Sequence, residues 1–156
     1  MGMSDRGFGV GATGVTVALV AGFAVSVGIA LGAAQTTAGK TVWDGAFSAA
    51  QAERGKATYL AECSGCHLET LLGDGGASPA LIGKDFVEAW DKKSVRDLFA
   101  RIRNTMPATN PGGLTDQAYA HLAAYLLQMN KFPEGTAELP PDAEALKAIL
   151  IQLNKP

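Results

Sequence analysis

The chain has 156 residues, a length that predicts one domain plus additional segments. Hydrophobic residues make up 47% of the sequence, a fraction that the uncharged N-terminal region inflates. The formal net charge of −2 offers no basic surface for nucleic acid, so nucleic-acid binding is excluded as the main function.

The N-terminal region carries no charge over residues 7–39, and two interpretations of it stay open. A cleaved secretory signal would use Arg6, an apolar core and the small residues 32–34 as its cleavage site. A retained membrane anchor would use residues 15–34, because a spanning helix needs about 20 residues whereas a signal core has about 7–15. Both interpretations make residues 1–34 a targeting segment and place the rest on the periplasmic side of the inner membrane.

Composition divides the remaining chain into three parts. Residues 35–42 form a polar linker, and residues 43–130 are predicted to be the folded domain. Residues 131–156 form a proline-containing C-terminal extension with a short apolar stretch. The sequence leaves open whether this extension wraps the domain or docks on a partner.

The first predicted helix of the domain covers residues 49–62, which carry an Ala-rich helical pattern. Ser48 precedes it as an N-cap, with Gln51 three residues later in the capping-box position. Gly55 costs about 1 kcal/mol relative to Ala inside a helix. We therefore expect another helix to approach closely at Gly55, the alternative being a tolerated surface glycine.

Residues 63–67 read Cys-Ser-Gly-Cys-His, the spacing used for covalent attachment of a c-type haem. Cys63 and Cys66 are one helical turn apart, so both thiols can add to the vinyl groups of one porphyrin. His67 then lies under the macrocycle, where its imidazole can bind the iron. A structural zinc site would need four ligands, usually from two such pairs. A thioredoxin-like dithiol would be accompanied by a βαβ pattern, and none is visible in the sequence. A simple disulfide would leave His67 unexplained.

The region after His67 loses regular pattern, and residues 73–79 form a loop by their turn chemistry. This loop has room to pass round the edge of a haem. Five apolar residues beside it are predicted to wall the haem pocket, the alternative being ordinary core: Leu68, Leu71, Leu72, Leu81 and Ile82.

Residues 83–90 are predicted to form a short helix or turn with Phe86 and Trp90 inward. Basic residues cluster in and after this stretch, interleaved with acidic ones. They form either a docking ring or a solvated mixed-charge face. These basic residues are Lys84, Lys92, Lys93, Arg96, Arg101 and Arg103.

The next helix begins after Ser94, an N-cap with Asp97 three residues later. It should end near Thr105, because Pro107 disfavours helix at the preceding residue. The backbone of Met106 is therefore expected to be extended just after the end of this helix, where the Met106 side chain can project into a pocket.

The last helix of the domain is predicted over residues 116–129, with Thr115 as its N-cap. Its apolar stripe includes Met129, which makes that methionine a core residue. His121 lies on the same helix and is an alternative second iron ligand, although the helix is expected to cross away from the iron.

These features resemble the class I monohaem c-type cytochromes over residues 43–130. In that family a methionine well downstream supplies the second axial ligand, and residues 103–107 match that stretch. The resemblance implies that His67 and Met106 are the two iron ligands.

The family also has a Pro-x-Leu-x-Gly loop after the haem histidine, which residues 79–83 match. The resemblance implies that Pro79 and Leu81 contribute to the haem site, and that the Pro79 carbonyl accepts a hydrogen bond from His67. It also implies that the helix containing Gly55 crosses the helix at residues 116–129.

The resemblance implies an all-α class I cytochrome c fold, with three to five short helices around one covalently attached haem c and an apolar N-terminal helix before them. More narrowly, the chain is similar to small periplasmic cytochromes c of quinoprotein dehydrogenase systems and to haem-c subunits of terminal oxidases. Because the haem supplies much of the core, the apo form should be poorly folded.

The leading function is one-electron transfer between redox partners, with no catalysis at iron because both axial positions are filled. The expected donor is a dehydrogenase or a quinol-oxidising complex, and the expected acceptor is a terminal oxidase or a reaction centre. A second hypothesis is a fixed haem subunit of a larger membrane assembly. A third is a five-coordinate haem that binds a gas or reduces peroxide, for which no distal His or Arg motif is present.

Overall fold

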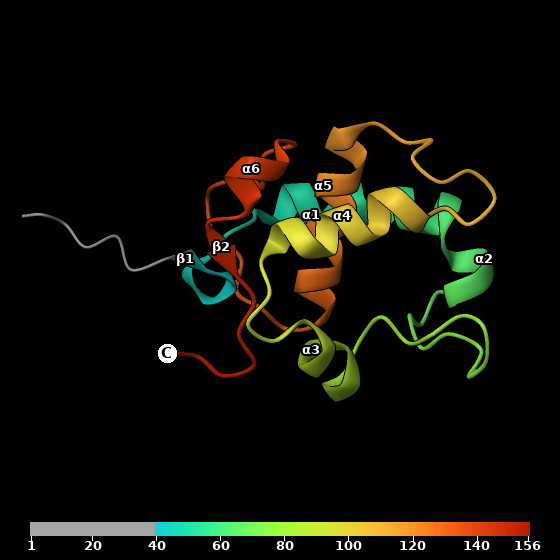
Figure 1. Ribbon diagram of the computed structural model, residues 1–156, viewed down its shortest axis with the longest axis horizontal. Helices are drawn as coiled ribbons and strands as arrows, with labels where there is room; N and C mark the ends of the chain where they lie inside the picture. Colours follow the sequence, from blue (N-terminus) through green and yellow to red (C-terminus); the bar gives the residue numbers. More distant parts are fainter. Residues whose placement is uncertain (1–39) are drawn as a thin grey trace, which may run out of the picture. The chain divides into compact units, whose positions relative to one another are not determined.

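A computed structural model describes residues 40–156 of the chain (Figure 1). The predicted signal or anchor at residues 1–34 lies outside the described residues, as does most of the predicted linker. Within residues 40–156, no helix combines the length and the apolar character needed to cross a bilayer.

The described chain is mainly helical, which confirms the predicted all-α class. The described elements, in chain order, are β1 (Lys40–Thr41), the 3-10 helix η1 (Val42–Asp44), α1 (Ala49–Glu62), α2 (Ser64–His67), α3 (Lys84–Trp90), α4 (Val95–Thr105), α5 (Asp116–Met129), α6 (Ala143–Leu146) and β2 (Ile149–Leu150). The six α-helices among these residues exceed the three to five expected, because single turns form at the Cys-x-x-Cys-His motif and in the C-terminal extension.

The predicted N-caps form at all three long helices. The side chains of Ser48, Ser94 and Thr115 each accept a backbone hydrogen bond from the first turn of their helix. Asp97 completes a capping box with Ser94, as expected. Gln51 does not complete one with Ser48, because its amide is hydrogen-bonded elsewhere.

Helices α1 and α5 make the most extensive contact between described elements, and Gly55 lies where they cross. A Cβ at this position would run into the backbone carbonyl of His121 and come within 2.9 Å of the Tyr125 Cβ. The Tyr59 and Tyr125 rings pack beside it with centroids 5.4 Å apart. The prediction that Gly55 allows a close helix crossing is therefore confirmed.

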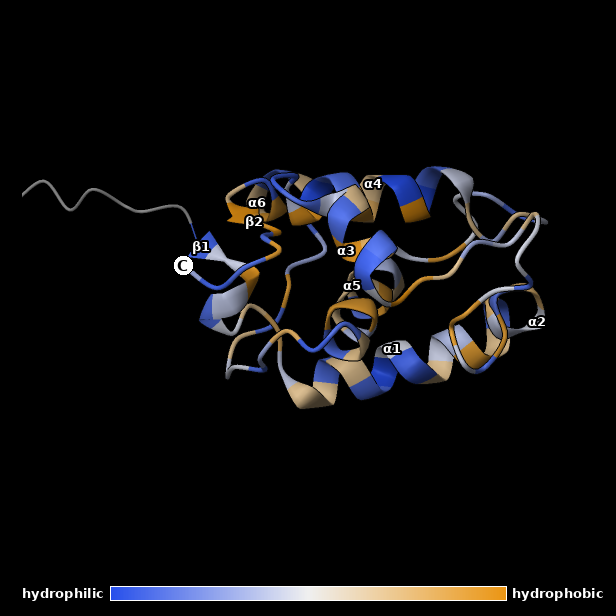
Figure 2. Cartoon of the chain, turned by 90° about the horizontal axis from the view of Figure 1, so that it is seen from below, coloured by the Kyte–Doolittle hydropathy of each residue, from blue (hydrophilic) through white to orange (hydrophobic). Residues whose placement is uncertain are grey.

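Helix α4 covers another side of α5 through an amphipathic pattern. Val95, Leu98 and Phe99 are buried on its inner face. Figure 2 shows the hydrophobic residues of α4 turned toward α5 and its hydrophilic residues turned away. An isolated helix of 11 residues is only marginally stable in water, so the stability of α4 depends on packing this stripe against the domain.

The C-terminal extension packs onto the domain. Of its two possible roles, wrapping the domain or docking on a partner, the described structure shows wrapping. Leu139, Leu146 and Ile151 are fully buried. Gln51 of α1 binds the extension through both amide atoms, donating to the Leu139 carbonyl at 2.8 Å and accepting from the Leu139 N–H at 2.8 Å.

The start of the described chain is fixed to the same extension. β1 and β2 pair in parallel, with Lys40 opposite Ile149. The Trp43 indole donates to the Gln152 carbonyl at 2.9 Å. Val42, in the predicted linker, has no exposed surface, so the packed unit includes the end of that linker.

Candidate haem-binding site

A cavity of about 780 Å³ opens between α2 with its following loop, α3, α4 and α5. Its volume lies within the range usual for small-molecule and cofactor sites. All six residues predicted for the haem site line it: Cys63, Cys66, His67, Pro79, Leu81 and Met106.

The Cys-x-x-Cys-His motif is shaped by the end of α1 and the single turn of α2. The Cys63 N–H still bonds to the Tyr59 carbonyl at 2.9 Å, and the His67 N–H bonds to the Cys63 carbonyl at 3.0 Å. These bonds bring both cysteines and the histidine to the same wall of the cavity.

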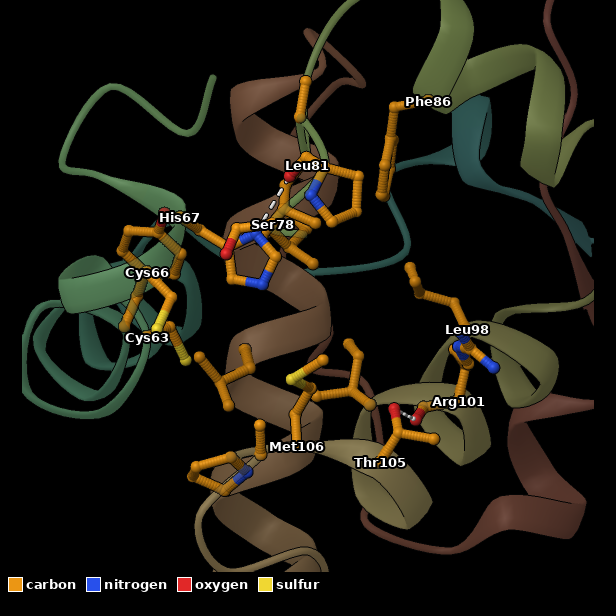
Figure 3. A pocket seen from close by; sticks show the side chains of 18 of the residues that line it. Cys63, Cys66, His67, Ser78, Leu81, Phe86, Leu98, Arg101, Thr105 and Met106 are labelled. Atoms are coloured by element: carbon orange, nitrogen blue, oxygen red, sulfur yellow. Dashed lines mark hydrogen bonds between the residues drawn. The ribbon is translucent and has the colours of Figure 1, made fainter. Parts of the chain in front are cut away.

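The His67 ring is buried and held by one hydrogen bond. Its Nδ1 lies 2.9 Å from the Pro79 carbonyl oxygen. A carbonyl oxygen only accepts, so Nδ1 must donate, and the neutral ring then keeps a lone pair on Nε2. Figure 3 shows this second nitrogen turned into the cavity. A carbonyl partner on the far nitrogen is the usual way in which a metal-binding histidine is oriented.

The loop carrying Pro79 is anchored at both ends. The Leu81 N–H bonds to the Leu71 carbonyl at 2.8 Å. The Asn130 side chain donates to the Leu81 carbonyl at 2.9 Å and accepts from the Gly83 N–H at 3.0 Å. Asn130 directly follows the helix predicted over residues 116–129 and was not predicted to contribute to the site. Its amide, with both a donor and an acceptor at a helix end, was the available signal in the sequence.

Met106 lies on the wall opposite His67, and Figure 3 shows its sulfur turned toward the histidine ring. Its backbone is extended, as predicted, with φ −130° and ψ 152°. Its N–H bonds to the Ile102 carbonyl at 2.8 Å, and its carbonyl accepts from the Tyr119 hydroxyl at 2.8 Å. The sequence analysis missed Tyr119, because a buried tyrosine on a helix carries no local sign of its hydroxyl's partner.

The two cysteines are not joined to each other. Burial raises the pKa of the Cys63 thiol to about 11, with smaller contributions from Glu62 and Cys66. The free Cys63 thiol is therefore neutral at physiological pH.

The prediction of the apolar walls was mostly wrong. Of the five residues named, only Leu81 lines the cavity; Leu71 is buried in the core, while Leu68 and Leu72 are exposed. The loop has positive φ angles at Leu68 (62°) and Leu71 (61°), and its residues line the cavity only from Ala77 onward. The apolar walls come instead from helices: Phe86, Trp90, Leu98, Ile102, Leu122 and Leu126.

His121, the alternative axial candidate, does not line the cavity, and neither does Met129, which was predicted to be a core residue. Met129 packs against the core at the end of α5. His121 faces Arg54 and Gln117, whose side-chain nitrogens lie 3.3 Å and 2.9 Å from its Nε2. Among residues 40–156 there is also no group of three or more His, Cys, Asp or Glu side chains that could hold a metal ion.

These residues fit a c-type haem. Two thiols stand beside a histidine whose free nitrogen faces a mostly apolar cavity, with a thioether on the opposite wall. Imidazole and thioether are the axial ligands of c-type cytochromes. Cys63 and Cys66 would hold the porphyrin, and His67 and Met106 would hold the iron.

Comparison with protein families matches residues 50–126 to the family described as "Cytochrome C oxidase, cbb3-type, subunit III". A search of curated proteins found no match. A search of solved structures found none either. The matched region contains the motif, the cavity walls and Met106, and it ends before the C-terminal extension. Residues 50–126 therefore belong to the c-type cytochromes, in the class I fold, and the cofactor of this electron-transfer domain is covalently bound haem c.

Proposed function

We propose that this protein is a one-electron carrier on the periplasmic side of the inner membrane, with His67 and Met106 as axial ligands. The observation that carries this proposal is their placement, with the free nitrogen of His67 and the sulfur of Met106 facing each other across one cavity. With both axial positions filled, no open site remains for a substrate at iron.

The residues around the cavity have separate tasks in this proposal. Haem c supplies an iron that changes between the ferrous and ferric states. Cys63 and Cys66 would hold it covalently, and the Pro79 carbonyl orients the His67 ring by accepting from its Nδ1–H. Tyr119 and the end of α4 fix the Met106 backbone, which would hold its thioether in place beside the iron. Helical side chains such as Leu98 exclude water from the site.

Replacing Met106 with Leu tests the ligand assignment. The change keeps size and apolar character, so the free energy of unfolding should fall by less than about 1.5 kcal/mol. The loss of the thioether should lower the reduction potential and let carbon monoxide bind the reduced protein, because axial ligands set potentials over a range of about 0.8 V. Redox titration and absorption spectra measure both effects.

Met129→Leu is the matched control, because Met129 lies outside the cavity lining. It should change neither the reduction potential nor carbon monoxide binding. If Met106→Leu also left both unchanged, another residue would be the sixth ligand and the proposal would fail.

A second candidate function is a fixed haem-c subunit of a larger respiratory assembly. The family description, which names a subunit of an oxidase, favours it. Purification of the native protein in mild detergent separates the two functions. A carrier should migrate alone, whereas a subunit should co-purify with other chains in fixed stoichiometry.

A further inference from the structure

The acidic residues of the haem-motif segment are not balanced by basic ones. From residue 57 to residue 83 the chain has no Lys or Arg, but it contains Glu62, Glu69 and Asp74. All three side chains are exposed, and none forms an ion pair with another described residue.

The same segment holds most of the exposed apolar surface. Four large hydrophobic residues are exposed within residues 40–156, and three of them are Leu60, Leu68 and Leu72, at 43%, 44% and 58%. Figure 1 shows the end of α1, α2 and the loop after it at one side of the domain, away from β1 and β2. We call these residues the acidic-apolar face: Leu60, Glu62, Leu68, Glu69, Leu72 and Asp74.

This face borders the haem-binding cavity. Glu62 itself lines the cavity, and the exposed Cys66 lies between Glu62 and Leu68 in the chain. A protein docked here would be next to the cofactor. An apolar centre with a charged rim is the usual composition of a protein–protein interface, and redox encounters use small ones.

The basic residues of the domain form a different kind of surface. Lys84, Arg96 and Arg103 are each paired with a carboxylate, at Glu88, Glu144 and Asp116. Of the two interpretations left open for the basic cluster, these pairs favour the solvated mixed-charge face. Lys92, Lys93 and Arg101 form no ion pair with a described residue, and Arg101 lines the cavity from α4. On the haem-motif side of the cavity, the unpaired charge is that of Glu62.

We propose that the acidic-apolar face is the docking surface for a redox protein whose own docking surface is basic around an apolar centre. The proposal rests on the electron-carrier function and adds the chemistry of the partner. Charge complementarity selects this occupant, since it steers encounter and suppresses wrong partners. A second copy of this chain would present the same three carboxylates and be repelled, as would an anionic lipid surface.

The test compares two holoprotein variants with the same change in net charge. Glu62→Gln with Glu69→Gln neutralises the proposed face. Glu134→Gln with Glu144→Gln neutralises two exposed carboxylates in the C-terminal extension. The reduced proteins are oxidised by stopped flow with one of two one-electron acceptors, the cationic and apolar cobalt(III) tris(phenanthroline) or the anionic ferricyanide.

The face variant should react about threefold more slowly with the cobalt complex at low salt, and its rate should depend less on ionic strength. The control variant should stay close to the parent. With ferricyanide the face variant should instead react faster. Leu72→Ser should slow the oxidation of the protein by the cobalt complex at every ionic strength, because salt does not screen an apolar contact.

Equal rates for the two double variants would overturn the docking surface while leaving the carrier function intact. Dimerisation in sedimentation that Leu72→Ser abolishes would also overturn it, in favour of a second copy. If neither acceptor oxidised the reduced parent protein, the carrier function itself would fail, and the inference with it.

Discussion

Two regions around the α1–α5 pair are built differently, and we call them the packed end and the cavity end. The packed end consists of the Gly55 crossing and the C-terminal extension, where Leu139, Leu146 and Ile151 are fully buried. At the cavity end, Leu122 and Leu126 of α5 line a void of about 780 Å³. The same two helices thus pack into a core of side chains at the packed end and form part of the wall of a cofactor site at the cavity end. Only the cavity end needs the haem to complete its packing.

The largest effect should follow from breaking the packed end at Gly55. Gly55→Leu would force its side chain into the backbone of α5, which cannot rotate away as a side chain can. We expect a loss of about 3 kcal/mol or more in the free energy of unfolding, measured by urea denaturation of the holoprotein. Gly76→Ala, where a Cβ would meet only Asp74 Oδ1 at 3.6 Å, is the control. Similar stability of the two variants would contradict the close crossing.

Gln51→Leu should weaken the packed end and leave the cavity end unchanged. The buried N–H and carbonyl of Leu139 would both lose their partner, at a cost of about 2–3 kcal/mol. The absorption spectrum and reduction potential should stay those of the parent. Gln128→Leu, which removes an exposed hydrogen bond to Glu134, should cost less than about 0.5 kcal/mol. A shift in reduction potential in Gln51→Leu would show that the two ends are coupled.

Tyr119→Phe should weaken the cavity end with a smaller cost in stability. The Met106 carbonyl would lose its 2.8 Å hydrogen bond, which is worth about 1 kcal/mol. The looser Met106 should leave the iron more readily, so carbon monoxide should bind the reduced protein faster in flash photolysis. Tyr125→Phe is the control, since no hydrogen bond of its hydroxyl to a described residue is present. Unchanged carbon monoxide kinetics in Tyr119→Phe would show that the loop alone fixes Met106.

The smallest effect concerns the pH dependence of the packed end. Burial, and then Arg54, hold the pKa of His121 below its usual 6.5, while Glu138 opposes them; Gln117 faces the same ring nitrogen. The unfolded chain therefore binds more protons as pH falls from 6.5 towards the folded pKa, and stability is lost across that window. His121→Gln should flatten the stability profile below pH 6.5. A slope equal to that of the parent would assign the pH dependence to other groups.

The sequence predicted the local structure well because its signals are local. Caps such as Ser94 with Asp97, and the proline that ends α4, depend only on hydrogen bonds and sterics within a few residues. The spacing of the Cys-x-x-Cys-His motif by itself indicates covalent haem attachment. For these features, the residue types and their order were sufficient.

The walls of the cavity were predicted poorly because they depend on distant packing. Leu68 and Leu72 are as apolar as Leu98, but they are exposed on the loop after α2, whereas α4 places Leu98 in the cavity wall. Hydrophobicity alone cannot separate a residue that faces a cofactor from one that faces solvent beside it. That distinction requires the backbone path.

The sequence alone was sufficient to predict the cofactor, its attachment points and the helices that surround it, because covalent chemistry and helix capping act over a few residues. Only the tertiary structure decided that Asn130 holds the Pro79 loop, that Tyr119 holds Met106, and that the C-terminal extension closes the packed end through Gln51. Each of these hydrogen bonds joins residues more than ten positions apart in the chain. Their partners are chosen by how the helices pack, which no local pattern records.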